Sequence, residues 1–135
     1  MRVFIENVVD KDTVKMLYPG KQDFDNTIIK GILAKIEDVI GKRCTNPPSY
    51  ATIEQGEKGH NWHTDIGTNG HMKWCNYGIS VLLKKSKGGL FKYKAPYKEY
   101  TQDEHYLNAL VHSNDECHKV DKSTKGRTVL LMFLQ

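Results

Sequence analysis

Apolar side chains recur at helical spacing over residues 26–41 and at shorter intervals after residue 50. In the first region they follow one another three or four positions apart, the period that gathers them on one face of a helix. Asp25 or Asn26 is a suitable N-cap, and Gly41 is a suitable C-terminal stop. We therefore predict a long amphipathic helix that packs its apolar stripe on a core. That stripe comprises Ile28, Ile29, Ile32, Leu33, Ile36, Val39 and Ile40.

Five short β-like segments follow Pro47-Pro48. Glycine and charged turns separate them, and no strong helical pattern intervenes. This spacing favours an antiparallel sandwich or barrel over alternating strands and helices. The last segment is almost entirely apolar, so we expect it to be buried. The segments cover residues 50–55, 78–84, 90–93, 106–112 and 128–134.

The N-terminal part of the chain predicts two smaller elements. Residues 3–5 and 8–9 indicate a short strand or extended entry. Asp10 is a suitable N-cap for a short helix over residues 12–17, which Pro19-Gly20 would end. Because the sequence has no repeat and no linker, we expect residues 1–135 to form a single domain. Residues 1–49 would be its helical support and residues 50–135 a jelly-roll core.

Composition and charge narrow the classes of protein. The apolar share of 39% and the mixed charges argue against disorder. The net charge of +4 is mildly basic, which permits an anionic partner without requiring one. No apolar stretch approaches membrane-spanning length, and the first residues lack the apolar core of a signal peptide. The odd set of Cys44, Cys75 and Cys117 without a CxxC pair predicts reduced thiols and a cytoplasmic location.

The main chemical signal is a split set of metal-ligand residues. His63 and Asp65 lie two residues apart, and positions i and i+2 of a strand face the same side. His118 lies far downstream, and Arg127 follows it at the start of the last strand. Two imidazoles and one carboxylate can cap one face of an octahedral ion and leave three positions open. Arg127 is suited to a carboxylate-bearing co-substrate, because arginine binds carboxylates in a bidentate manner.

Each part of this set also has a plainer interpretation. The His63–Asp65 pair can arise by chance in a chain with six histidines. His118 can be a surface imidazole in a charged turn, and Arg127 can be an ordinary charge at a strand entry. His60, His71, His105 and His112 are competing ligands, and His112 is the main rival because it ends the apolar run of residues 107–111.

Taken together, the elements resemble the prolyl-hydroxylase branch of the Fe(II)/2-oxoglutarate-dependent dioxygenases. The resemblance implies a double-stranded β-helix (jelly-roll), mainly β, with N-terminal helices. It also implies that His63, Asp65 and His118 hold Fe(II), that Arg127 pairs with the distal carboxylate of 2-oxoglutarate, and that O2 takes the remaining position. It rests on residues 3–9, Gly56 with Trp62-His63-Thr64-Asp65, residues 80–83 with 88–91, and His118-Lys119-Val120 with Gly126-Arg127.

The implied activity is hydroxylation of a prolyl or other side chain in a peptide or protein, with release of succinate and CO2. One position departs from the family pattern. Members commonly carry a tyrosine near the glycine turn that helps to hold the distal carboxylate, and here Glu54 stands in that place. An ionised carboxylate cannot serve in this way, so Tyr50 or Tyr77 is the candidate replacement.

Other functions stay open. Lysines interleaved with aromatics over residues 84–100 are typical of single-stranded nucleic-acid binders, although lysine-rich edges usually serve solubility. A non-catalytic jelly-roll that binds metal or nucleic acid would fit this stretch and Glu54. An oxygenase acting on nucleic acid is disfavoured, because Phe133 stands where such enzymes carry a second arginine. A hydrolytic zinc site lacks an obvious general base. Residues 95–104 are a candidate loop over the cavity.

Overall fold

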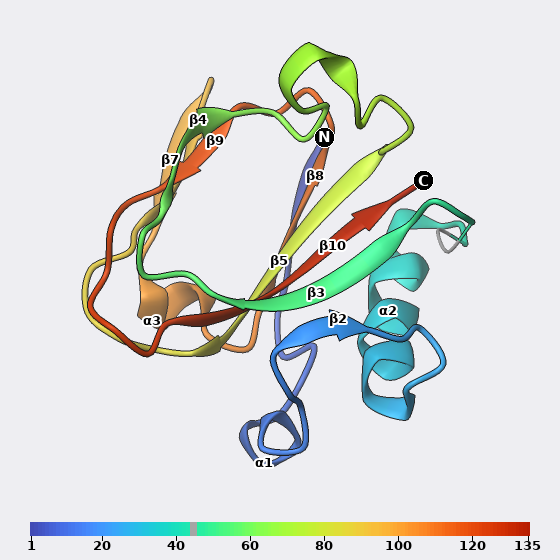
Figure 1. The fold of residues 1–135 in the computed structure, drawn as a ribbon, viewed down its shortest axis with the longest axis horizontal. Coiled ribbons are helices and arrows are strands. Elements are labelled where there is room, and N and C mark those ends of the chain that lie inside the picture. The colour runs from blue at the N-terminus through green and yellow to red at the C-terminus, as the bar shows by residue number, and fades with distance from the viewer. Residues whose placement is uncertain (44–45) are drawn as a thin grey trace.

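The computed structural model describes residues 1–43 and 46–135 as two antiparallel β-sheets with one long helix outside (Figure 1). Cys44 lies outside the described residues, and both Cys75 and Cys117 are free thiols. The larger sheet has the order β1 (Arg2–Ile5), β8 (Ala109–Ser113), β5 (Tyr77–Lys84), β10 (Thr128–Leu134), β3 (Tyr50–Gln55) and β2 (Gly20–Gln22). The smaller sheet has the order β4 (His60–His63), β9 (His118–Val120), β6 (Phe91–Lys94) and β7 (Tyr97–Tyr100).

The two sheets form the jelly-roll that the sequence predicts. The strand order mixes elements from both ends of the chain, since β10 lies between β3 and β5 while β1 pairs with β8. The predicted strands 50–55 and 128–134 are confirmed as β3 and β10. Within the described residues, no helix is long and apolar enough to cross a membrane.

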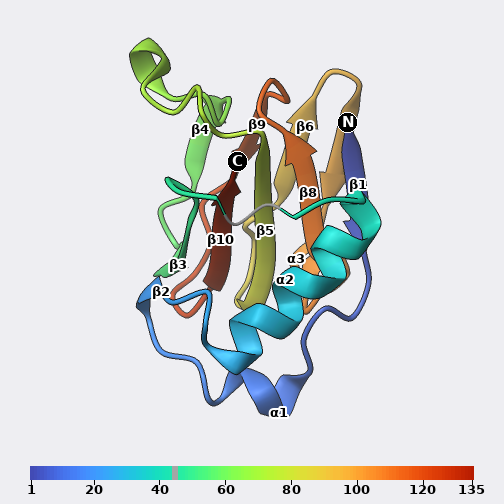
Figure 2. The same cartoon turned by 90° about the vertical axis from the view of Figure 1, so that its right-hand side faces the viewer.

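The long helix α2 (Thr27–Ile40) lies across the outer face of the larger sheet (Figure 2). Asn26 is its N-cap, since its side-chain oxygen accepts hydrogen bonds from two backbone amides of the first turn. Gly41 ends it in the left-handed conformation at φ 85°, where glycine has no steric penalty. Ile29, Ile32, Leu33 and Ile36 are buried, which confirms the predicted stripe, whereas Val39 is exposed.

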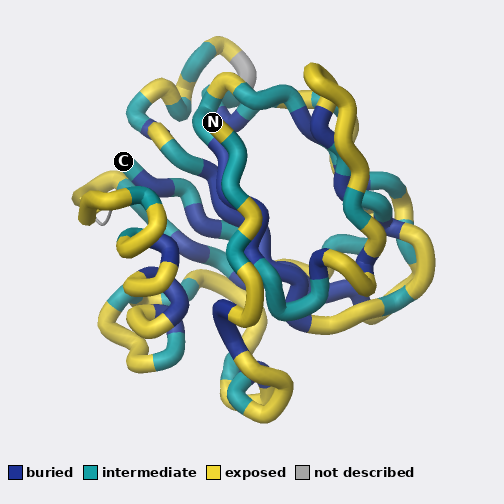
Figure 3. The backbone as a smooth tube through the Cα atoms, turned by 180° about the vertical axis from the view of Figure 1, so that it is seen from behind, coloured by how far each residue is buried: buried dark blue, intermediate teal, exposed yellow. Residues whose placement is uncertain are grey.

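Alternate residues of the larger sheet belong to two different faces. Side chains of one parity pack under α2 and form the main apolar core, which we call the helix face. Side chains of the other parity point toward the smaller sheet, and we call this the cavity face. The helix face includes Ala51, Ile53, Val81, Leu83, Leu130, Met132 and Leu134. The cavity face includes Tyr50, Thr52, Glu54, Ser80, Val129, Leu131 and Phe133. Burial is greatest along these central strands (Figure 3).

The structure differs from the sequence predictions at several elements. The N-terminal part contributes β1 and β2 to the larger sheet in addition to its helices. The helix expected over residues 12–17 is the shorter α1 (Lys11–Val14), capped by Asp10 as predicted. Residues 95–104, the candidate covering loop, instead form β7 and α3 (Gln102–His105), because Thr101 and Glu104 make a capping box.

Candidate metal centre and anion pocket

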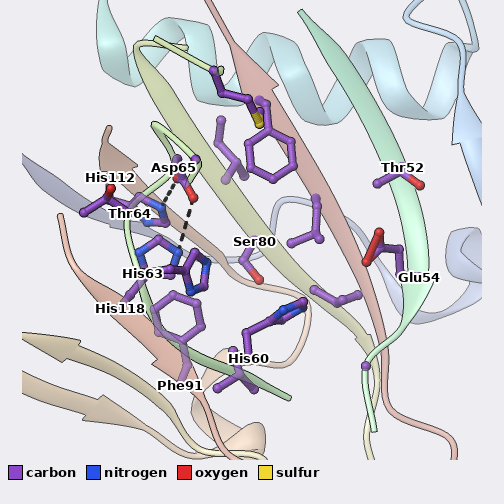
Figure 4. Close-up of a pocket in the computed structure, with 18 of the residues that line it drawn as sticks. Thr52, Glu54, His60, His63, Thr64, Asp65, Ser80, Phe91, His112 and His118 are labelled. Carbon is purple, nitrogen blue, oxygen red and sulfur yellow. Dashed lines mark hydrogen bonds and ion pairs between the residues drawn. The ribbon is translucent and has the colours of Figure 1, made fainter. Parts of the chain in front are cut away.

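A cavity of about 280 Å³ lies between the two sheets. Its walls come from β3, β5, β8 and β10 of the larger sheet and from β4, β6 and β9 of the smaller one. Apolar side chains cover most of the wall, with a few polar groups at two places. One of these places holds histidines and an aspartate (Figure 4). The other holds an arginine. The polar residues among the lining are Thr52, Glu54, His60, His63, Thr64, Asp65, Ser80, His112, His118 and Arg127.

His63, Asp65 and His118 come together at the first of these places. Their ligand atoms all lie within 4.8 Å of one another. His63 ends β4 and pairs across the sheet with His118 at the start of β9. Asp65 lies in the turn after β4, so the predicted placement of both residues on one strand was wrong. The turn still brings the carboxylate to the imidazoles, at 3.4 Å between Asp65 Oδ1 and His118 Nε2.

Both imidazoles are oriented by hydrogen bonds to the backbone. The Nδ1 atom of His63 lies 2.6 Å from the carbonyl oxygen of Asn61, and that of His118 lies 2.8 Å from the carbonyl oxygen of Glu116. A carbonyl only accepts, so each Nδ1 carries the proton and donates it. In the neutral imidazole each Nε2 atom then keeps a free lone pair, which is the arrangement found at histidine ligands of metals.

Asp65 is buried, with 6% of its surface exposed, and is charged. Burial alone would raise its pKa, but the hydrogen bond from His112 and the neighbouring imidazole of His118 outweigh that effect. They hold the pKa of Asp65 well below its usual range. Burial also lowers the pKa of His63, which favours the neutral imidazole that a metal requires. The cluster thus offers one anion and neutral nitrogen donors to a cation.

Arg127 forms the second polar place, and its side chain is fully enclosed at 2% exposure. It makes no ion pair within residues 1–43 and 46–135, and its Nε atom has no hydrogen-bond partner there. Its Nη1 atom makes one long contact of 3.4 Å to the carbonyl oxygen of Gly56. Desolvation lowers the pKa of Arg127 but leaves a cation, because arginine does not lose its proton in proteins.

Gly56 provides the space for this guanidinium. A Cβ atom at position 56 would lie 2.2 Å from Arg127 Nη1, which is closer than any real contact. A buried and unpaired arginine is costly, so its presence indicates a site for an anion. A carboxylate is the natural partner for its planar donors.

Tyr50 and Tyr77, the two candidates for binding the distal carboxylate together with Arg127, lie in different parts of the structure. Tyr50 lies on the cavity face and lines the cavity, where its ring packs against Trp74 and Phe133. Tyr77 has the opposite parity on β5, packs with the core under α2 and is not among the lining residues of the cavity. The ammonium of Lys42 lies 5.0 Å from its ring centroid, in a different depression. Glu54 also lines the cavity, opposite Val129.

The competing histidines fall in different places. His60 lines the cavity beside His63, with ring centroids 5.7 Å apart. His71 and His105 are not among the lining residues. His105 is buried and bonds the carbonyl oxygen of Ser80 at 2.9 Å, and burial lowers its pKa to about 4. His112, the main rival of His118, lines the cavity, but its Nε2 atom is hydrogen-bonded to Asp65 Oδ2.

The comparisons with known proteins give a consistent picture of the fold. No family model and no curated protein matches the sequence. A prolyl-4-hydroxylase from Pseudomonas putida matches with a TM-score of 0.72 and 11% identity, over 99% of this chain and 84% of that one. The epimerase SnoN, a non-heme alpha-ketoglutarate-dependent protein of nogalamycin biosynthesis, matches with a TM-score of 0.61 and 11% identity, over 99% and 77%.

A third structure is an oxidoreductase of the 2OG-Fe(II) oxygenase family from Burkholderia pseudomallei. It matches with a TM-score of 0.60 and 17% identity over 83% of this chain. This chain shares the fold of the 2OG-Fe(II) oxygenases. It spans about half the length of the Burkholderia protein, since the match covers 54% of that chain. At these identities the likeness concerns the fold, and the chemistry has to be argued from the cavity itself.

Sequence reasoning named His112 only as a rival ligand and missed the supporting role that it has together with Tyr93 and Gly78. Tyr93 is hydrogen-bonded to His112, which is in turn hydrogen-bonded to Asp65. Gly78 lies next to Asp65 and His112, where a side chain would collide with both. Strand parity would have placed His112 on the same face as Leu110, toward the interior. Nothing local in the sequence ties Tyr93 to His112, because the contact joins strands of two different sheets.

Proposed function

We propose that this chain is an Fe(II)- and 2-oxoglutarate-dependent dioxygenase. One observation carries the proposal: the His63–Asp65–His118 cluster and the buried, unpaired Arg127 open into the same cavity. Two neutral imidazoles and one carboxylate suit Fe(II) and leave coordination positions for other ligands. The fold shared with 2OG-Fe(II) oxygenases supports this proposal.

The residues present fit both groups. His63 and His118 would offer their Nε2 atoms, and Asp65 would offer Oδ1, to the metal. Arg127 would bind the distal carboxylate of 2-oxoglutarate, which supplies the anion that its enclosed guanidinium lacks. Together with O2, these groups supply oxidation of a C–H bond to an alcohol, coupled to conversion of 2-oxoglutarate to succinate and CO2.

The chain's own contribution is binding, orientation and exclusion of water. The hydrogen bonds to the carbonyls of Asn61 and Glu116 fix the two imidazoles before a metal arrives. Between the metal cluster and Arg127, the cavity wall includes Val129, Leu131 and Phe133. This apolar wall lowers the local dielectric and strengthens the pairing of Arg127 with a carboxylate.

We propose a prolyl or other side chain of a peptide or protein as the substrate. Support comes from the similarity to a prolyl-4-hydroxylase over nearly the whole chain. Tyr50 would then line the substrate path, because it lies on the cavity face opposite Phe133, at the other end of β10 from Arg127. We further propose that residues 1–135 form one domain, in which residues 1–49 support a jelly-roll core formed by residues 50–135.

A nucleic-acid-binding jelly-roll is the second candidate. The ammonium groups of Lys94 and Lys119 lie 5.7 and 5.5 Å from the ring centroid of Trp62, which makes a basic and aromatic surface. However, Lys92 and Lys119 both pair with Asp121, so part of that charge is already neutralised. An oxygenase acting on nucleic acid would combine the two candidates.

The test is an anaerobic titration of the protein with Fe(II) and 2-oxoglutarate, followed by its visible charge-transfer absorption. We expect a band in the wild type that disappears in His118→Ala and is lost or strongly weakened in Arg127→Ala. Arg43→Ala, which removes an exposed arginine away from the cavity, is the matched control and should keep the band. Metal binding without any band in the wild type would contradict the proposal and favour the non-catalytic candidate.

A further inference from the structure

A buried chain of hydrogen bonds runs from the smaller sheet to the back of Asp65. The hydroxyl of Tyr93 lies 2.9 Å from His112 Nδ1, and His112 Nε2 lies 2.6 Å from Asp65 Oδ2. Tyr93 and His112 are exposed by only 1% and 2%. Neither residue belongs to the metal-binding set of the described residues.

The direction of these bonds follows from the acceptors. Asp65 is ionised and can only accept, so Nε2 of His112 carries the proton and donates it. The Nδ1 atom of the neutral imidazole is then an acceptor, and the phenol of Tyr93 donates to it. Both nitrogens of His112 are thus engaged, which leaves no lone pair for a metal.

Gly78 is required for this arrangement. A Cβ atom at position 78 would lie 1.8 Å from Asp65 Oδ2 and 2.7 Å from His112 Nε2. Any side chain there would displace the carboxylate or the imidazole. Gly78 lies on β5 opposite His112 of β8, so the sheet itself brings the imidazole to this gap.

The two oxygens of Asp65 therefore have different surroundings. Oδ2 is capped by the N–H of His112, whereas Oδ1 lies on the side of His118, 3.4 Å from its Nε2 atom. We propose that His112, held by Tyr93, is a positioning residue that keeps Asp65 a single-oxygen ligand through Oδ1. This inference rests on the proposed function, because it assigns His112 a role toward the same metal.

The consequence concerns the number of open positions. A carboxylate that chelates through both oxygens would take one more position on the ion. A single-oxygen carboxylate and two imidazoles leave three, enough for a chelating keto acid and O2. Outer hydrogen bonds of this kind typically contribute ten- to a hundred-fold in metal affinity.

The test uses the full chain and Co(II) alone, whose visible spectrum reports coordination number, without 2-oxoglutarate. His112→Leu replaces the N–H donor by an apolar side chain that still fills much of the space. We expect Co(II) affinity to fall by roughly ten- to a hundred-fold. We also expect its spectrum to shift toward a higher number of protein oxygen ligands. His112→Gln restores an N–H donor and should recover most of the affinity. Tyr93→Phe should cost only about three- to ten-fold.

His105→Leu is the matched control, because His105 is an equally buried imidazole that bonds the backbone carbonyl of Ser80 and does not itself line the cavity. It should destabilise the protein in urea denaturation yet bind Co(II) as the wild type does. If His112→Leu does not fold, His112→Gln and Tyr93→Phe still decide the question through their spectra. A folded His112→Leu with wild-type affinity and spectrum overturns the inference, as does magnetic resonance evidence that three imidazoles bind Co(II) in the wild type.

These outcomes are distinct from failure of the proposed function. If wild-type protein binds Co(II) and the variants behave as expected, but no 2-oxoglutarate binds, the dioxygenase proposal fails and the role of His112 at the metal stands. If 2-oxoglutarate binds normally and His112→Leu changes nothing, only the role of His112 is lost.

Discussion

The helix face and the cavity face of the larger sheet are built by alternate residues of the same strands. On β10, Leu130, Met132 and Leu134 pack under α2 and are fully buried, whereas Val129, Leu131 and Phe133 line the cavity. The first set contributes folding free energy through apolar burial. The second set surrounds a cluster of charges and imidazoles whose burial opposes folding unless a ligand binds. A shift of one residue in strand register would exchange the two functions.

This contrast explains why Arg127 can stay unpaired. The helix face supplies the stability that allows the cavity face to hold an enclosed cation and a dense histidine cluster. The cost of those groups is then recovered when a metal and an anion bind, because anything that binds only the native state stabilises it.

The largest expected effect is in the core between α2 and the helix face. Ile36→Ala should lower the free energy of unfolding by about 2–5 kcal/mol, because Ile36 is fully buried and the change leaves a cavity. Co(II) affinity of the folded fraction should stay at the wild-type value. Urea denaturation and Co(II) titration on one preparation measure both, and a large loss of affinity in folded protein would show that the two faces are coupled.

Arg127→Met should have opposite effects on stability and binding. Removal of an enclosed, unpaired cation should raise the free energy of unfolding of the ligand-free protein by roughly 1–3 kcal/mol. Affinity for 2-oxoglutarate should fall by about a hundred-fold, since a charge-assisted bidentate contact is lost. Denaturation with and without 2-oxoglutarate and Co(II) checks both effects. Destabilisation of the ligand-free protein would argue that Arg127 has a structural partner.

The stability of the protein should depend on pH through the buried imidazole of His105. The folded pKa of His105 is about 4, below its ordinary 6.5, because burial disfavours the cation. The unfolded chain therefore takes up this proton first, and stability should fall as pH drops from 6.5 toward 4. Between pH 7 and 5 the loss is roughly 2 kcal/mol from this group. His105→Gln should flatten the slope in urea denaturation across that range, and an unchanged slope would assign the titration to other groups.

The smallest expected effect concerns Glu54. It lies on the cavity face opposite Val129, two positions along β10 from Arg127, so its charge repels an incoming carboxylate. Glu54→Gln should tighten 2-oxoglutarate binding by about three-fold, with a smaller difference at high salt because the site is partly exposed. Weaker binding in Glu54→Gln would instead indicate that Glu54 organises Arg127.

The sequence predicted the parts of the fold that depend on local periodicity. The stripe of α2, its Asn26 and Gly41 ends, and strands β3 and β10 all follow from spacing and capping. It could not place short strands such as β4 and β9, whose pairing depends on partners far along the chain. Short polar strands carry little hydrophobic pattern, so their position is decided by tertiary contacts.

The candidate site also contains some residues that the sequence predicted and others that it did not. His63, Asp65, His118 and Arg127 were selected from motif order, and the structure places all of them around one cavity. Tyr77 lies outside the cavity because its parity on β5 directs it to the core under α2. The supporting role of His112 could not be predicted, because its partners Tyr93 and Asp65 lie far from it in the sequence. Residues that act through contacts between sheets have no signature in a single sequence.

The most direct test of the cavity face is a crystal structure of the protein grown without oxygen in the presence of Mn(II) and 2-oxoglutarate. We predict an anomalous peak within coordination distance of His63 Nε2, Asp65 Oδ1 and His118 Nε2. The distal carboxylate should lie against Arg127, and Asp65 Oδ2 should remain bonded to His112. A metal held by His112 in place of His118, or a carboxylate bound away from Arg127, would contradict this account.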